Sequence, residues 1–283
     1  MRISERHSNV PVGSSVIAVV GAFDPLSDAH FDLFRQMSRA GTDAALTALV
    51  IILFPAPATF VNPHYDGCLA YSALEARLAL IRQFGNIHAL VVRMTKSDID
   101  ASCEDFVDLL NTRVNLRELW LGPNQSLGRG RQGSYDAIAA LAKSRNVSLR
   151  RLGGQSGLLA GRGALNLASK GKLRDAMRAT GHPPIWGRPR AGRLQLHWPP
   201  GRYLALPIAE PSFSLRVTRE PVPIEVHRIS SLRRYFEWPS RDIRWLLFAR
   251  GPADASQSMT RLMSDLRSDL RNYHVDAPVS VLV

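Results

Sequence analysis

A short apolar run that ends in glycine and leads into a helix constrains this chain more than any other feature. Residues 15–20, SVIAVV, form a mostly apolar, β-branched run that ends at Gly21, which is the pattern of a buried strand that leads into a loop. Residues 29–39 then place Phe31, Phe34 and Met37 at intervals of three residues, which predicts a helix. Strand, loop and helix in this order form the opening unit of a parallel sheet.

The same alternation recurs along the next hundred residues. Further strands are predicted over 46–54, 87–94, 118–122 and 147–152, and further helices over 72–85, 103–114 and 134–146. Ser102, with Asp105 three residues later, predicts a capped helix start. The pattern predicts a Rossmann-like, doubly wound α/β domain with helices on both faces. Ligands of such sheets bind beyond the carboxyl ends of the strands, where residues 21–30 and 122–133 fall.

The composition and pattern of the sequence change near residue 185. The segment 182–187, HPPIWG, breaks any helix, and the residues beyond it are aromatic and punctuated by proline. They predict a smaller, mostly antiparallel β domain. Residues 258–273 carry apolar side chains on one helical face, which predicts a C-terminal helix. The expected domains are therefore 1–184 and 185–283.

The net charge of +12 is unevenly distributed. Residues 1–150 hold 15 Lys and Arg against 14 Asp and Glu, and residues 151–283 hold 21 against 10. A basic half attracts nucleotides, nucleic acid or anionic lipid alike, and its alternative is a set of solvated arginines, so charge alone does not identify a partner.

Composition excludes several other classes of protein. Cys68 and Cys103 are the only cysteines, too few for a disulfide framework or a structural zinc site. No segment has the ~18 to 20 uninterrupted apolar residues that cross a bilayer. The N-terminal apolar run is too short for a cleaved signal and leads straight into the candidate loop. We therefore expect a cytoplasmic protein without a membrane partner.

The segment from Gly21 to His30, GAFDPLSDAH, offers a phosphate site in physical terms. Gly21 permits close approach of the backbone to a ligand, Phe23 can anchor the turn in the core, and Asp24 shapes the loop. A helix start carries free N–H groups and a partial positive charge, which favour phosphate. His30, on the first turn, can donate a hydrogen bond to a phosphoryl oxygen. Taken alone, a histidine at this position is more often a surface residue.

This segment resembles the G-x-F-D-P-x-[TH]-x-G-H signature of the HxGH nucleotidyltransferase superfamily. The chain from about 14 to 190 resembles the bacterial bifunctional FAD synthetase family, riboflavin kinase plus FMN adenylyltransferase, with its elements in consistent order: ILFPAP at 52–57, the helix at 71–85 and GPNQSLGRGRQG at 122–133. The resemblance implies transfer of AMP from ATP to FMN, giving FAD and pyrophosphate. It also implies Mg²⁺ bound through the phosphates, with no metal ligands from the protein.

The resemblance also assigns site residues. His30 is expected to contact the ATP phosphates, with Ser27 in the place of the motif's Thr or His as a second catalytic residue. The expected nucleotide-binding residues are Gly21, Phe23, Asp24, Gly122, Asn124, Gly128, Arg131, Ser169 and Arg174. On the alternative interpretation, Arg131 and Arg174 are solvated surface charges.

Several positions depart from the family's pattern. Ser27 replaces a His of the flavin branch, Ala29 the motif's Gly, Ala56 a His, and Asn124 an Asp. Ser27 keeps a hydroxyl that can donate to phosphate, whereas Ala56 has no polar atom in its side chain. These departures bear more on recognition of the FMN acceptor than on binding of the nucleotide.

The second half resembles the riboflavin kinase module only in parts. Residues 223–230 resemble the strand with its catalytic Glu, so Glu225 is a possible remnant, but the G-F-P-T-A-N element is absent. We therefore expect riboflavin kinase activity to be lost. Two alternatives remain: a catalytically impaired flavin- or nucleotide-binding paralogue with a regulatory role, and a nucleic-acid binder. The last rests on charge alone, because no nucleic-acid motif is present.

Overall fold

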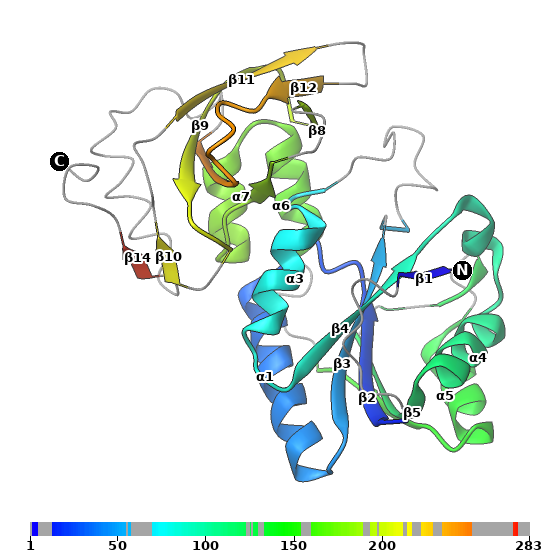
Figure 1. The fold of residues 1–283 in the computed structure, drawn as a ribbon. Helices are drawn as coiled ribbons and strands as arrows, with labels where there is room; N and C mark the ends of the chain where they lie inside the picture. The colour runs from blue at the N-terminus through cyan, green and yellow to red at the C-terminus, as the bar shows by residue number, and fades with distance from the viewer. Residues whose placement is uncertain are drawn as a thin grey trace. The chain divides into compact units, whose positions relative to one another are not determined.

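The chain packs as two compact units (Figure 1). The computed structural model describes residues 2–4, 13–54, 56–57, 70–122, 125, 127–129, 133–153, 160–188, 193–196, 198–211, 214–216, 222–228, 234–250 and 274–276. The first unit comprises Met1–Phe23, Phe31–Pro63 and Phe84–Leu158, and the second Asp24–His30, His64–Gln83 and Leu159–Val283. The domain boundary expected between 184 and 185 stays a prediction.

A six-stranded sheet with the order β1-β4-β3-β2-β5-β6 forms the centre of the first unit. Its strands are β1 Arg2–Ser4, β2 Ser15–Gly21, β3 Thr47–Phe54, β4 Ile87–Arg93, β5 Asn115–Leu121 and β6 Ser148–Arg151. Five of them run parallel, and β1 is antiparallel to β4. The strand order reverses at β2, which lies between β3 and β5. The Rossmann-like prediction is confirmed, and β2 stands at the topological switch point.

Helices cover both faces of this sheet. Among the described residues these helices are α1 Asp28–Asp43, α4 Cys103–Arg113 and α5 Tyr135–Ser144, and the short 3₁₀ helix η2 Lys96–Asp100 precedes α4 in the chain. Figure 1 shows α4 and α5 on one face and α1 on the other. The core under α4 and α5 includes Leu110 and Ile138 packed with Leu49 of β3. The predicted cap of α4 is present: the Ser102 hydroxyl accepts the Asp105 amide at 3.0 Å, and the Asp105 carboxylate accepts the Ser102 amide at 3.1 Å.

The described residues of the second unit include an antiparallel sheet and three helices. Its sheet has the order β7-β13-β9-β11-β12-β8, and each neighbouring pair is antiparallel, as predicted. The strands are β7 Ile185–Gly187, β8 Arg193–Leu196, β9 Gly201–Ile208, β11 Val222–Arg228, β12 Arg234–Glu237 and β13 Trp245–Arg250; β10 Ser214–Arg216 and β14 His274–Asp276 pair separately. The helices are α3 Leu74–Arg82, α6 Ala160–Ser169 and α7 Leu173–Thr180.

The core of this unit combines aromatic side chains of residues 186–248 with apolar side chains of the helices. The rings of Trp198 and Phe248 lie 4.9 Å apart, edge to face, in a cluster that also contains Ala76 of α3 and Met177 of α7. α3 therefore packs with the second sheet's core, although its sequence belongs to the alternating pattern of the first domain. The predicted helix over 258–273 lies outside the described residues.

Candidate nucleotide site

The loop after β2 begins with a turn that is anchored in the core of the first unit. Phe23 has a φ of 49° and is buried, and its ring centroid lies 5.6 Å from that of Phe34 on α1. A Cβ atom at Gly21 would lie 3.2 Å from the Phe23 ring, tighter than ordinary contact. Phe23 thus anchors the turn as the sequence predicts, and Gly21 leaves room for that ring. Their contacts with a nucleotide stay a prediction.

The Asp24 carboxylate accepts hydrogen bonds from two backbone amides of the protein. One carboxylate oxygen accepts a hydrogen bond from the Tyr71 amide at 2.9 Å, and the other accepts one from the Ser72 amide at 3.1 Å. Burial raises the pKa of Asp24 above its usual value, while the charge of Arg77 and these two amides act in the opposite direction. Asp24 therefore shapes the loop, in agreement with the expectation from sequence.

Ser27 and His30 form a hydrogen-bonded pair at the start of α1. The Ser27 hydroxyl lies 2.8 Å from Nδ1 of His30, and the His30 amide donates to the Ser27 carbonyl at 2.8 Å. Ser27 is buried and His30 is partly buried. Burial lowers the pKa of His30 to about 4, so its imidazole is neutral at pH 7. The two residues that the resemblance marks as catalytic are thus brought together.

The side chain of Gln125, which was not predicted as a site residue from the sequence, bridges the carboxyl ends of β2 and β5. The Gln125 side chain accepts a hydrogen bond from the Gly122 amide at 3.1 Å and donates one to the Val20 carbonyl at 2.7 Å. The bridge lies where the strand order reverses, the usual ligand-binding edge of such a sheet. No sequence signal marks Gln125, because its role depends on the pairing of β2 with β5.

Gly128 allows its loop to pack closely against the start of α4. Its φ is +78°, and a Cβ atom there would overlap the backbone nitrogen of Cys103 at the start of α4. Next to it, the Arg129 amide donates to the Ala101 carbonyl at 2.8 Å. Asn124 and Arg131, predicted to line the nucleotide in the same loop, lie outside the described residues.

The remaining candidates belong to the second unit. Ser169 is exposed at the end of α6, and its hydroxyl donates to the Asn166 carbonyl at 2.8 Å. Arg174 is half-buried in the first turn of α7. Glu225 is exposed on β11 between the buried Ile224 and Val226. The ligand-binding roles of Ser169 and Arg174, and the kinase role of Glu225, stay predictions.

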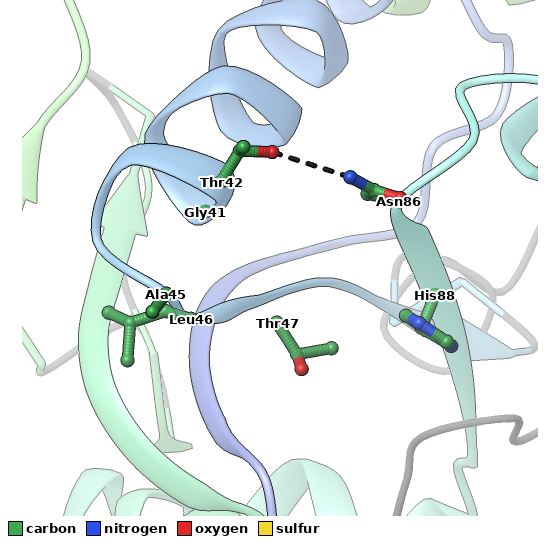
Figure 2. A pocket seen from close by; sticks show the side chains of 7 residues that line it. All are labelled: Gly41, Thr42, Ala45, Leu46, Thr47, Asn86 and His88. Atoms are coloured by element: carbon green, nitrogen blue, oxygen red, sulfur yellow. Dashed lines mark hydrogen bonds between the residues drawn. The ribbon is translucent and has the colours of Figure 1, made fainter.

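A cavity of about 300 Å³ lies at the other end of the first sheet (Figure 2). It is lined by Gly41, Thr42, Ala45, Leu46, Thr47, Asn86 and His88. Thr42 lies near the end of α1, and Thr47 and His88 lie at the amino ends of β3 and β4. The side-chain amide of Asn86 donates a hydrogen bond of 3.3 Å to the Thr42 hydroxyl. Gly21 is the last residue of the parallel strand β2 and lies at the opposite, carboxyl end of the sheet, so this cavity is separate from the loop that begins there.

Among the described residues, no three His, Cys, Asp or Glu side chains lie close enough together to hold a metal ion. Nor do those residues include a helix of the length and apolar character needed to span a membrane.

Comparison with known proteins identifies the family. A bifunctional riboflavin kinase/FMN adenylyltransferase from Buchnera aphidicola subsp. Acyrthosiphon pisum is 21% identical over 136 residues, 48% of this chain and 43% of that protein, so the match spans less than half of the relative. A macrolide-efflux protein from Streptococcus pneumoniae shares the fold, with a TM-score of 0.62 at 14% identity over 93% of this chain and 95% of its own. Residues 11–155, just over half of the chain, match FAD synthetase. The chain belongs to the FAD synthetase family.

Proposed function

We propose that this protein transfers AMP from ATP to FMN. The observation that carries the proposal is the hydrogen bond between the Ser27 hydroxyl and Nδ1 of His30, 2.8 Å long, at the start of α1. Both residues lie within the segment that matches FAD synthetase. The same segment supplies the loop after the central strand β2, at the edge where ligands of doubly wound sheets bind.

The reaction exchanges one phosphoryl bond for another. A phosphate oxygen of FMN forms a bond with the α-phosphorus of ATP, and the bond from that phosphorus to the bridging oxygen breaks. The electron pair leaves with pyrophosphate, and FAD is the other product. Such chemistry needs little covalent participation by the protein, so alignment and stabilisation of negative charge dominate.

In this proposal, His30 acts as a neutral hydrogen-bond donor. Its pKa of about 4 keeps the ring uncharged near pH 7. If the Ser27 hydroxyl donates to Nδ1, the ring proton lies on Nε2. We assign to that N–H a hydrogen bond to a phosphoryl oxygen in the complex with ATP, where negative charge grows in the transition state. Ser27 orients the ring and takes over a role that the flavin branch gives to histidine.

The start of α1 also favours the binding of negatively charged phosphate. The helix begins at Asp28, and first-turn amides of a helix carry partial positive charge toward an anion. We assign Arg131 and Arg174 to further phosphate contacts, and Gly122 and Asn124 to the nucleotide side of the site. Magnesium, held through the phosphates, would neutralise part of their charge.

We further propose that riboflavin kinase activity is lost. The second unit keeps an antiparallel sheet with Glu225 on β11, but the sequence after Ala191 lacks the element that serves nucleotide and metal in the kinase module. The purified protein should therefore form no FMN from riboflavin and ATP. A cytoplasmic location and partners limited to ATP and FMN stay predictions from the sequence.

The experiment is a product assay with a binding measurement beside it. The protein is incubated with FMN, ATP and Mg²⁺, and FAD and pyrophosphate are quantified; the proposal expects both in equal amounts. Calorimetry on the same preparation compares ATP, FMN, FAD and riboflavin. Flavin or nucleotide binding without turnover would contradict the proposal and favour the catalytically impaired binding protein. That alternative is motivated by the departures at Ser27, Ala29 and Ala56.

A further inference from the structure

Two consecutive residues, Tyr71 and Ser72, join the loop of the candidate site to the second sheet. Their amides donate to the two carboxylate oxygens of Asp24. The Ser72 hydroxyl accepts the Ile185 amide at 3.1 Å, and the Tyr71 carbonyl accepts the indole N–H of Trp186 at 3.1 Å. Ile185 and Trp186 open β7. Tyr71 and Ser72 therefore form hydrogen bonds both to the loop and to the strand β7.

The junction is buried and its polar groups are paired. Tyr71 and Ser72 are at most 2% exposed, and the Tyr71 hydroxyl donates to the His182 carbonyl at 2.8 Å. Hydrogen bonds from amides to a carboxylate are stronger than neutral ones. Loss of the Asp24 carboxylate would leave buried amides without acceptors, which is costly.

The loop from Asp24 to His30 has little freedom to absorb a shift of Asp24. Pro25 has a fixed φ and packs close to α6, since a Cβ at Gly161 would lie 3.4 Å from its ring. Leu26 and Ser27 are each 2% exposed. A displacement at Asp24 is therefore passed along three constrained residues to the pair of Ser27 and His30.

We propose that Asp24 is a positioning residue for AMP transfer, because its carboxylate fixes the loop that carries Ser27 and His30 on the peptide pair that also holds β7. This inference rests on the proposed function. It changes the role of Asp24 from nucleotide contact to support of the residues that make the contact, and it makes the second unit's β7 part of that support.

The test compares Asp24→Asn with Thr180→Val in the full chain. The asparagine side chain has one acceptor oxygen and places an NH₂ group opposite an amide donor, so half of the anchor is lost. Thr180→Val removes a buried hydroxyl that, like the Tyr71 hydroxyl, donates to the His182 carbonyl at 2.8 Å. It leaves the Asp24 carboxylate in place, so it serves as a control for destabilisation of the same junction. Both are measured well below their unfolding temperatures.

Asp24→Asn is expected to lower kcat about 10- to 100-fold with little change in the KM for ATP, because His30 acts mainly in the transition state. Thr180→Val is expected to keep the wild-type kcat. Asp24→Glu, which retains the carboxylate on a longer side chain, should recover part of the rate. Equal kcat values for wild type and Asp24→Asn, or equal losses in Asp24→Asn and Thr180→Val, would overturn the proposal.

Hydrogen exchange gives a second readout that needs no activity. Asp24→Asn should speed exchange of the amides of residues 22–31 and 71–72 in the protein without ligand, whereas Thr180→Val should leave them protected. Unchanged exchange in Asp24→Asn would refute the anchor even if FAD is made. Faster exchange in a protein that makes no FAD would keep the anchor and reject the proposed function instead.

Discussion

The Ser27 hydroxyl and Nδ1 of His30 lie 2.8 Å apart, three residues from each other across the start of α1. The pair explains how a serine can stand where the flavin branch has histidine. A hydroxyl at this position can fix the ring's orientation and proton position without adding a second titratable group. The departure from the motif at residue 27 thus leaves His30, the proposed catalytic residue, with a defined hydrogen-bond partner.

Removal of this hydroxyl should slow the reaction. Ser27→Ala is expected to lower kcat for FAD formation about 10-fold, the value of one hydrogen bond of roughly 1 to 1.5 kcal/mol. Ser27→Thr keeps the hydroxyl and should retain most of the rate. Steady-state kinetics with saturating ATP and FMN measures both variants. A Ser27→Ala enzyme as fast as wild type would show that the pair has no role in catalysis.

The free energy of unfolding should decrease as the pH is lowered, because two histidines are buried in the folded protein. Burial lowers the pKa of His182, like that of His30, to about 4, whereas an unfolded histidine titrates near 6.5. Between these values the unfolded chain binds more protons, so unfolding becomes easier as pH falls from about 6.5 to about 4, by up to roughly 1.4 kcal/mol per pH unit for each histidine. Above pH 6.5 their stabilising effect is complete.

Urea denaturation at a series of pH values checks this expectation. His182→Gln removes one of the two titrating groups, so its free energy of unfolding should depend less steeply on pH than that of wild type, whatever its absolute stability. Thr180→Val, in the same core, should keep the wild-type slope. Parallel pH profiles for wild type and His182→Gln would show that His182 does not stay neutral in the folded protein.

Gly128 offers a test of the loop that carries other predicted nucleotide contacts. Gly128 and Gly85 both have positive φ, +78° and +68°, but a Cβ at Gly85 meets nothing within 4 Å. Gly85→Ala should therefore cost only the backbone strain of about 1 to 2 kcal/mol. Gly128→Ala must also displace the backbone at Cys103, which adds about 1 to 3 kcal/mol.

Thermal unfolding of the two glycine variants measures this difference. Gly128→Ala should unfold at the lower temperature. Equal losses would mean that the approach of Gly128 to α4 does not constrain the loop.

Local patterns foretold the first sheet well. The apolar runs at β2 and β3 predicted their strands to within one residue, and Ser102 with Asp105 predicted the cap of α4. Both patterns depend only on neighbours in sequence, namely the burial of successive residues and the capping of one helix turn. The candidate loop at residues 21–30 could be located because it follows such a strand.

Other features depend on contacts that a sequence does not display. No helix was predicted over residues 160–180, where α6 and α7 form, since Gly161, Gly163 and Gly171 weaken the helical pattern. The bridge made by Gln125 needs β2 and β5 to be neighbours. The anchor of Asp24 joins residues 47 positions apart. Tertiary packing decides each of these.

The rate of FAD formation by wild type and His30→Ala tests the central claim most directly. With FMN, ATP and Mg²⁺, the wild-type protein should release FAD and pyrophosphate together, and His30→Ala should do so about 10² to 10³ times more slowly, because it loses a donor to the transition state. Circular dichroism of the variant establishes that it is folded. Wild-type protein that forms no more FAD than His30→Ala would contradict the claim.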